Sequence, residues 1–166
     1  MKKPKLLKII LFSLIGAKAM AFTLTSSAFT EKSTIPSEYT CDGKNLALPL
    51  AWSDAPQGTQ SFALIFDDKD APNGLWTHWV VWNIPASTNQ LANFLPSSIK
   101  EGINSWGKNN YGGPCPPKGE THHYVFHLYA LDTLLNIPEK STQADLRNAI
   151  KGHVLDKTEL MGTFGH

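Results

Sequence analysis

The sequence contains no apolar run long enough for a transmembrane helix. The run near the N-terminus, residues 9–17, has about half of the roughly 20 residues that a membrane span needs. Four lysines precede it, and Ala19-Met20-Ala21 follows it with the A-x-A spacing of a signal-peptide cleavage site. We expect residues 1–21 to be a signal peptide, with a transmembrane anchor as the alternative. The mature chain would then begin at Phe22 and be periplasmic or secreted.

A strong charge excess is also absent, because 15 Lys and Arg face 14 Asp and Glu. Five of the basic residues lie in the expected signal peptide, so residues 22–166 keep 10 basic and 14 acidic side chains, a formal −4. Nucleic-acid binding and attachment to a membrane through a basic patch both need the opposite balance. We therefore expect no nucleic-acid partner and no stable membrane insertion after signal cleavage.

Cysteine is scarce, with Cys41 and Cys115 as the only two in the chain. Disulfides persist in exported proteins, so we expect these two residues to be bonded to each other. A pair of buried free thiols is the alternative.

Several catalytic motifs are missing. The chain has no G-x-S-x-G nucleophile elbow, no G-x-x-x-x-G-K-[ST] phosphate loop and no H-E-x-x-H zinc motif. The motifs that are present therefore include no recognisable nucleophile, and no cofactor is expected.

Residues 22–166 predict one mainly β domain, without repeats, low-complexity tracts or an interdomain linker. Short apolar segments alternate with Gly, Pro and Asp turns, and we expect strands at residues 22–27, 48–53, 61–66, 79–84, 124–131 and 158–164. One helix should follow Thr142, which can cap it, with Leu146 and Ile150 on one face. The pattern favours a β-sandwich or open Greek-key sheets with one or two peripheral helices.

Two stretches set carboxylates or imidazoles beside prolines and glycines at strand ends. The first covers residues 67–79 and contains D-D-K-D-A-P and W-T-H-W. The second covers residues 112–126 and contains G-G-P-C-P-P-K-G and H-H-Y-V-F. Loops at strand ends commonly carry functional sites. If the two stretches meet, they form a small pocket of two carboxylates, two imidazoles and a phenol.

Alternation in extended chain assigns some of these side chains to faces. Asp68 and Asp70 should point the same way, and His122 should share a face with Tyr124. We expect His123, on the opposite face, to be structural or solvent-facing.

The same rule places Trp76 and His78 on one face with Val80 and Trp82. A histidine flanked by these apolar residues is partly buried and must find hydrogen-bond partners or stay neutral.

In combination, these motifs resemble the phosphatidylethanolamine-binding protein family, in its bacterial Raf-kinase-inhibitor-like branch. The resemblance is carried by D-x-D-A-P at 68–72, W-x-H-W at 76–79, P-P-x-G at 116–119 and H-x-Y-V at 122–125. It extends over nearly all of residues 22–166.

The resemblance implies an antiparallel Greek-key β-sandwich with a small anion pocket. The residues that it places in the pocket are Asp68, His78, His122 and Tyr124, and those around the rim are Asp70, Ala71, Trp76 and Pro117. The sharp reversal after Asp70 makes the Ala71–Pro72 bond a candidate for a cis peptide.

Two positions depart from the family pattern. Lys69 stands where proline is usual, which removes a φ restraint and adds a positive charge near the pocket mouth. His123 stands where arginine is usual, which removes a permanent charge and puts a structural ion pair in doubt.

The sequence thus predicts a secreted, non-catalytic binding protein for a small anion, such as a phosphate ester or phospholipid headgroup. One alternative is a metal-dependent hydrolase that uses Asp68, Asp70, His78 and His122. Another is an interaction module that modulates or inhibits a periplasmic or host protein. Histidine donors beside Asp68 should favour anion binding at mildly acidic pH.

Overall fold

The computed structural model describes residues 20–166, so the predicted signal peptide lies almost entirely outside the described residues. Within this part of the chain, no helix is both long and apolar enough to cross a membrane. The secondary-structure elements in chain order are β1 (Thr23–Ser26), η1 (Ser37–Tyr39), β2 (Leu50–Ser53), β3 (Ser61–Asp68), β4 (Trp76–Pro85), β5 (Gln90–Leu91), β6 (Lys100–Glu101), β7 (Thr121–Leu131), α1 (Gln143–Ala149) and β8 (Val154–Gly165).

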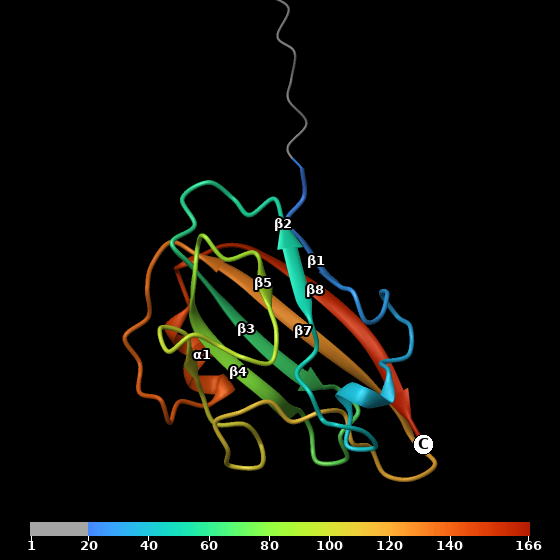
Figure 1. The fold of residues 1–166 in the computed structure, drawn as a ribbon. Helices are drawn as coiled ribbons and strands as arrows, with labels where there is room; N and C mark the ends of the chain where they lie inside the picture. The colour runs from blue at the N-terminus through green and yellow to red at the C-terminus, as the bar shows by residue number, and fades with distance from the viewer. Residues whose placement is uncertain (1–19) are drawn as a thin grey trace, which may run out of the picture.

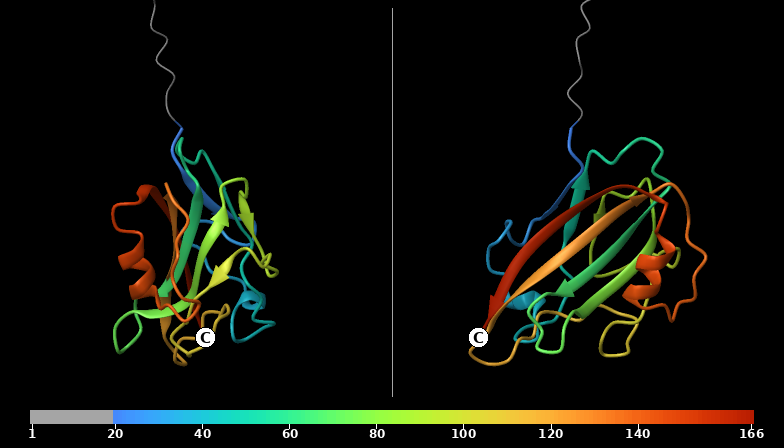
Figure 2. Two further views of the ribbon diagram at one scale, coloured as in Figure 1. Left: turned by 90° about the vertical axis from the view of Figure 1, so that its left-hand side faces the viewer. Right: turned by 180° about the vertical axis from the view of Figure 1, so that it is seen from behind.

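The strands form two antiparallel sheets (Figure 1). The larger one has the order β6-β4-β3-β7-β8, and the smaller one has the order β1-β2-β5. Figure 2 shows three layers, with α1 on one side of the large sheet and the small sheet on the other. The predicted antiparallel β-sandwich with peripheral helices is therefore confirmed.

The central strands of the large sheet are buried on both faces, as their continuous apolar runs predict. One face packs against the small sheet through residues such as Phe62, Leu64 and Phe126. The other face packs against α1 through a second cluster that includes Ile65 and Leu146.

The helix begins as the sequence predicts. The Thr142 side chain accepts a hydrogen bond from the Asp145 backbone N–H, and the Asp145 carboxylate accepts one from the Thr142 N–H. This capping box satisfies two backbone donors that a helix start would otherwise leave free.

Antiparallel pairing brings the two motif stretches to one end of the large sheet. Asp68, the last residue of β3, pairs with Trp76 at the start of β4 and with Tyr124 near the start of β7. The predicted meeting of the two stretches thus follows directly from strand register.

The predicted placement of His78 on the same face as Val80 and Trp82 is wrong. Asp67 pairs with Thr77 and Phe66 pairs with Trp79, so His78 is an extra residue in β4. A β-bulge of this kind shifts the alternation by one residue. Val80 consequently faces α1 with Trp82, whereas His78 lies against the ring of Phe66 on the small-sheet side.

The predicted cis peptide at Ala71–Pro72 is also wrong, because residues 20–166 contain no cis peptide bond. The chain reverses in a turn in which the Gly74 N–H donates to the Ala71 carbonyl at 3.0 Å. Pro72 is the second residue of this turn, a position that a trans proline fits, whereas cis proline belongs at the third.

Candidate functional site

A cavity of about 280 Å³ opens at the end of the large sheet where β3, β4 and β7 meet. We call it the strand-end pocket. Its lining residues are Asp68, Ala71, Pro72, Asn73, Trp76, His78, Trp106, Cys115, Pro117 and His122. Six of the eight predicted ligand residues are therefore brought together here. The other two, Asp70 and Tyr124, are not part of the lining.

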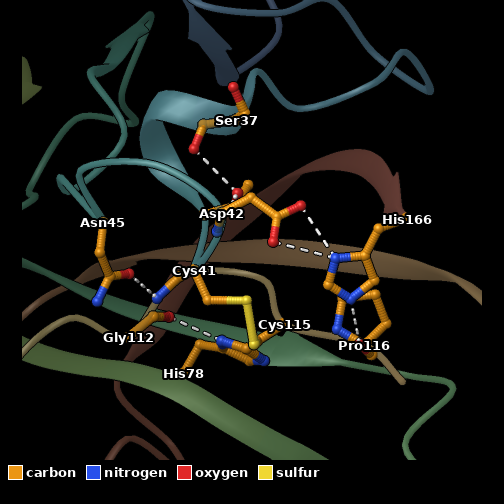
Figure 3. The surroundings of a disulfide bond; sticks show 11 residues. Ser37, Cys41, Asp42, Asn45, His78, Gly112, Cys115, Pro116 and His166 are labelled. Carbon is orange, nitrogen blue, oxygen red and sulfur yellow. Dashed lines mark hydrogen bonds and ion pairs between the residues drawn. A yellow bond between two sulfur atoms is a disulfide. The ribbon is translucent and has the colours of Figure 1, made fainter. Parts of the chain in front are cut away.

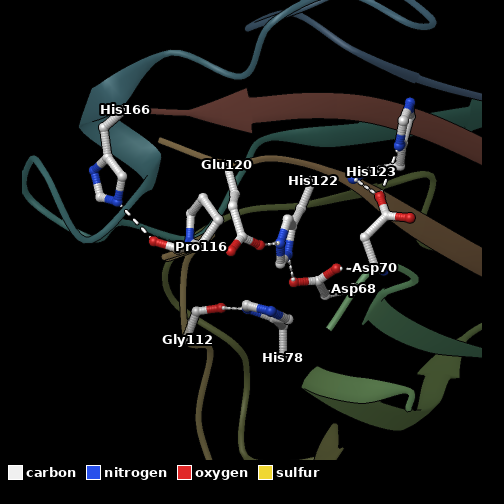
Figure 4. A network of polar contacts seen from close by, with 9 residues as sticks. All are labelled: Asp68, Asp70, His78, Gly112, Pro116, Glu120, His122, His123 and His166. Atoms are coloured by element: carbon white, nitrogen blue, oxygen red, sulfur yellow. Dashed lines mark hydrogen bonds and ion pairs between the residues drawn. The ribbon is translucent and has the colours of Figure 1, made fainter. Parts of the chain in front are cut away.

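His122 lies between two carboxylates (Figure 4). Its Nδ1 is 2.7 Å from Asp68 Oδ2, and its Nε2 is 3.0 Å from Glu120 Oε2. Burial lowers the pKa of His122, but the hydrogen bonds to Asp68 and Glu120 outweigh it, and the net pKa is raised above 6.5. Because both nitrogens face carboxylate oxygens, these contacts favour the imidazolium, which donates from both nitrogens.

The pKa of His78 is shifted in the opposite direction. Its Nδ1 is 2.7 Å from the Gly112 carbonyl oxygen, which can only accept, so Nδ1 carries the proton. Burial lowers the pKa of His78 to about 4, against the smaller opposing effects of Gly112 and Asp68. At neutral pH the ring is uncharged, and its Nε2 is a hydrogen-bond acceptor.

The Tyr124 ring packs against the rings of His78 and His122. Its ring centroid is 5.3 Å from that of His78 and 6.4 Å from that of His122. The phenol is buried, and its oxygen has no hydrogen-bond partner among residues 20–166. Burial raises the pKa of Tyr124, and the charge of Asp68 raises it further, so the hydroxyl stays protonated and able to donate.

Asp70 and His123 form a separate pair beside the pocket, which Figure 4 also shows. Asp70 Oδ2 accepts from the His123 backbone N–H at 2.7 Å and lies 2.7 Å from His123 Nδ1. Desolvation raises the pKa of Asp70, but the hydrogen bonds from His123 together outweigh it, and the net pKa is lowered. His123 thus keeps a side-chain contact with Asp70, which is an ion pair only when the His123 ring is protonated.

The disulfide predicted between Cys41 and Cys115 is present and forms part of the pocket wall (Figure 3). The two Cα atoms are 5.4 Å apart. Next to it, His166 Nε2 donates to the Pro116 carbonyl at 2.7 Å, and Nδ1 lies 2.9 Å from Asp42 Oδ2. The loop that carries Pro117 is thus fixed from two sides.

Some residues at the pocket were not predicted. Trp106 lies edge-on to His78 at 5.0 Å and to Trp76 at 5.3 Å, although it belongs to a loop far from both in sequence. Only its aromatic character in a Gly- and Asn-rich loop could have indicated a role. Glu120 was missed as well, and its spacing of two residues from His122 in an extended segment was the available signal.

Comparisons with known proteins identify the family of this chain. A sequence profile described as "phosphatidylethanolamine-binding protein" matches residues 25–165. The chain belongs to the phosphatidylethanolamine-binding protein family. A UPF0098 protein of Methanothermobacter thermautotrophicus is 44% identical over 147 residues, which cover 85% of this chain and 97% of that protein. A UPF0098 protein of Aquifex aeolicus is 40% identical over 94% of this chain and 95% of its own length.

Solved structures of this family have the same fold. A crystal structure of a phosphatidylethanolamine-binding protein homolog from Chlamydia trachomatis superimposes with a TM-score of 0.83 at 38% identity, over 88% of this chain and 98% of that one. E. coli YbcL, described as a new member of the mammalian family, gives 0.82 at 31% identity, over 87% and 98%.

The geometry gives no support to a metal centre. In the part of the chain from residue 20 onward, no three His, Cys, Asp or Glu side chains are grouped to hold a metal ion. Asp70, one of the four residues that the hydrolase alternative needs, is bonded to His123 and lies outside the pocket lining.

Proposed function

We propose that this family member is a secreted or periplasmic, non-catalytic binding protein whose strand-end pocket takes a small phosphate-type anion. The observation that carries the proposal is the His122 imidazolium, 3% exposed and held at the pocket wall. A buried cation with fixed orientation binds a phosphate oxygen by a charge-assisted hydrogen bond. The buried Tyr124 ring packs against His78 and His122 behind the lining and supports their positions.

The state of His78 narrows the ligand class. An uncharged imidazole that donates Nδ1–H to Gly112 offers only a lone pair at Nε2. It can accept from an O–H of the ligand but cannot donate to a bare anionic oxygen. The pocket therefore favours a singly charged anion that keeps a proton, such as a phosphate monoester monoanion, over a dianion. A phospholipid headgroup, whose phosphodiester has no O–H, is the less favoured source of the same phosphate chemistry.

The chemistry of the lining supports a non-catalytic role. The one sulfur at the wall, Cys115, is committed to a disulfide and is no nucleophile. Nδ1 of His78 is bonded to the Gly112 carbonyl and Nδ1 of His122 to Asp68, so neither of these nitrogens is available to a water for general acid–base catalysis.

Export is proposed on two grounds. The first is the signal-peptide pattern of residues 1–21, and the second is the disulfide, which persists outside the reducing cytosol. Nothing in residues 20–166 favours a specific partner protein, so modulation of a partner is not part of this proposal.

The test is calorimetric titration of the purified protein with inorganic phosphate and with phosphorylethanolamine. His122→Ala removes one charge-assisted hydrogen bond, worth about 1.5–3 kcal/mol, so affinity should fall tenfold or more. The matched control is His153→Ala, an exposed histidine paired with Asp132 away from the pocket, which should bind as wild type does. Equal binding by His122→Ala would place the site elsewhere, and steady release of phosphate from the ester would favour the hydrolase.

A further inference from the structure

His122 of the strand-end pocket is already bonded to the carboxylate of Glu120, which is not itself a lining residue. Glu120 Oε2 lies 3.0 Å from His122 Nε2, while Asp68 Oδ2 occupies the opposite nitrogen at 2.7 Å. Both N–H groups of the imidazolium are therefore in use. An incoming anion finds no free donor on His122 in this arrangement.

The two carboxylates differ in how firmly they are held. The Asp68 side chain is 7% exposed, and its Oδ1 also accepts the Asp70 backbone N–H at 2.8 Å. The Glu120 side chain is 53% exposed, and the bond to His122 is its one side-chain hydrogen bond among residues 20–166. Asp68 is thus a fixed orienting partner, whereas Glu120 can rotate into solvent by breaking only its bond to His122.

The charges around His122 also indicate that Glu120 must move before an anion binds. With His78 uncharged, the His122 imidazolium stands against the carboxylates of Asp68 and Glu120, so the group carries a net negative charge. A phosphate oxygen is therefore repelled while Glu120 stays in place. Once Glu120 swings out, its charge moves into water, where the repulsion is strongly screened.

We propose that Glu120 is a displaceable internal carboxylate that occupies the position of the ligand oxygen at His122 Nε2. Glu120 accepts the hydrogen bond of His122 Nε2 when no ligand is bound. Only an anion that binds His122 more tightly than the Glu120 carboxylate does can displace it. This inference rests on the proposed function, because it assumes that the ligand is an anion that bonds to His122.

The experiment is titration of the full protein with inorganic phosphate at one pH near 6, with three variants. Glu120→Ala removes the competing carboxylate and should raise affinity about tenfold or more, the effect of freeing one charge-assisted donor. Glu120→Asp keeps the charge but is one methylene shorter, so it should also bind more tightly than wild type. Glu38→Ala removes an exposed glutamate that pairs with Lys44, and it should leave affinity unchanged.

The outcomes separate the explanations. If Glu120→Asp binds as wild type does and only Glu120→Ala improves, the effect is long-range charge and the displacement proposal is overturned. Weaker binding by Glu120→Ala would make Glu120 a ligand residue and would overturn it too. If wild type binds phosphate and no Glu120 variant changes its affinity, the proposed function stands and this inference falls. If neither wild type nor any variant binds, both fall.

Discussion

Asp67 and Asp68 are consecutive residues of β3, and their carboxylates lie on opposite faces of the large sheet. Asp68 Oδ2 contacts His122 in the strand-end pocket, and Asp67 Oδ2 accepts from Arg147 of α1 at 3.0 Å. Arg147 also donates to the Tyr129 hydroxyl at 2.8 Å. The pocket carboxylate is therefore backed by a buried ionic contact that joins the helix to the same strand.

We expect Arg147→Met to destabilise the protein by about 1–3 kcal/mol at pH 8, because it leaves the fully buried Asp67 without its charged partner. Burial raises the pKa of Asp67, and Thr77, His127 and Arg147 oppose that rise. Without Arg147 the pKa of Asp67 rises further. Once the Asp67 carboxyl takes up a proton, the folded protein no longer contains an unpaired buried charge. The loss should therefore be smaller at pH 5, as measured by urea unfolding at both pH values.

The control for this prediction is the double variant Asp67→Asn/Arg147→Met. Asparagine removes the buried charge, so the double variant should be more stable than Arg147→Met alone at pH 8. An equal loss at both pH values for Arg147→Met would show that packing of the Arg147 stem, rather than the ion pair, explains the effect.

Much of the fold could be predicted because local signals agree with tertiary packing. The continuous apolar run at 61–66 is a central strand, and Thr142 and Asp145 cap the helix as their spacing indicates. The alternation rule failed in β4 because a bulge at His78 changes the register, and single-residue bulges have no clear sequence signal.

The candidate site was predictable to the extent that its residues lie at strand ends. Asp68 pairs with Trp76 and Tyr124 through strand register, and His122 lies two residues before Tyr124 in β7. Trp106 and Glu120 depend on loop paths and rotamers, which composition does not fix. The partner of Asp67 could not be predicted, because nothing near Asp67 in the sequence indicates a contact 80 residues away.

Loss of the Cys41–Cys115 bond should lower stability by about 4 kcal/mol, the chain-entropy value for a closed loop of this length. The bond joins residues 74 apart in the chain. The double variant Cys41→Ser/Cys115→Ser should show this loss in denaturant unfolding without reductant. Wild type in strong reductant should match it, and a midpoint that reductant leaves unchanged would contradict the prediction.

His166 should contribute stability at low pH that disappears as pH rises. Its Nε2 donates to Pro116, and its Nδ1 faces the Asp42 carboxylate, so both bonds need the protonated ring. The Pro116 and Asp42 contacts raise the pKa of His166. The contribution is complete below the unfolded value near 6.5 and is lost as pH passes the raised folded value.

Thermal unfolding of wild type and His166→Ala at about pH 6 and about pH 9 checks this prediction. The difference between the two proteins should be larger at the lower pH. Asp42→Asn should reduce the pH dependence in the same way. A difference between wild type and His166→Ala that grows with pH would reverse the assigned sign.

His78 gives the sharpest test of ligand class, through two ligands of equal charge. Near pH 5 methyl phosphate is a monoanion with one O–H, and dimethyl phosphate is a monoanion with none. The pKa of His78 is lowered to about 4, so its Nε2 still accepts at this pH. Because one hydrogen bond contributes about 0.5–1.5 kcal/mol, methyl phosphate should bind a few-fold to tenfold more tightly.

The variant His78→Phe, checked for folding by its thermal transition, should bind the two ligands equally, because no ring nitrogen remains to accept the ligand proton. A preference that persists in His78→Phe would assign the discrimination to ligand size. If wild type instead binds dimethyl phosphate as tightly as methyl phosphate, His78 accepts no ligand proton. A phosphodiester such as a phospholipid headgroup would then fit the strand-end pocket as well as a monoester, and the order of ligand classes argued from His78 would be wrong.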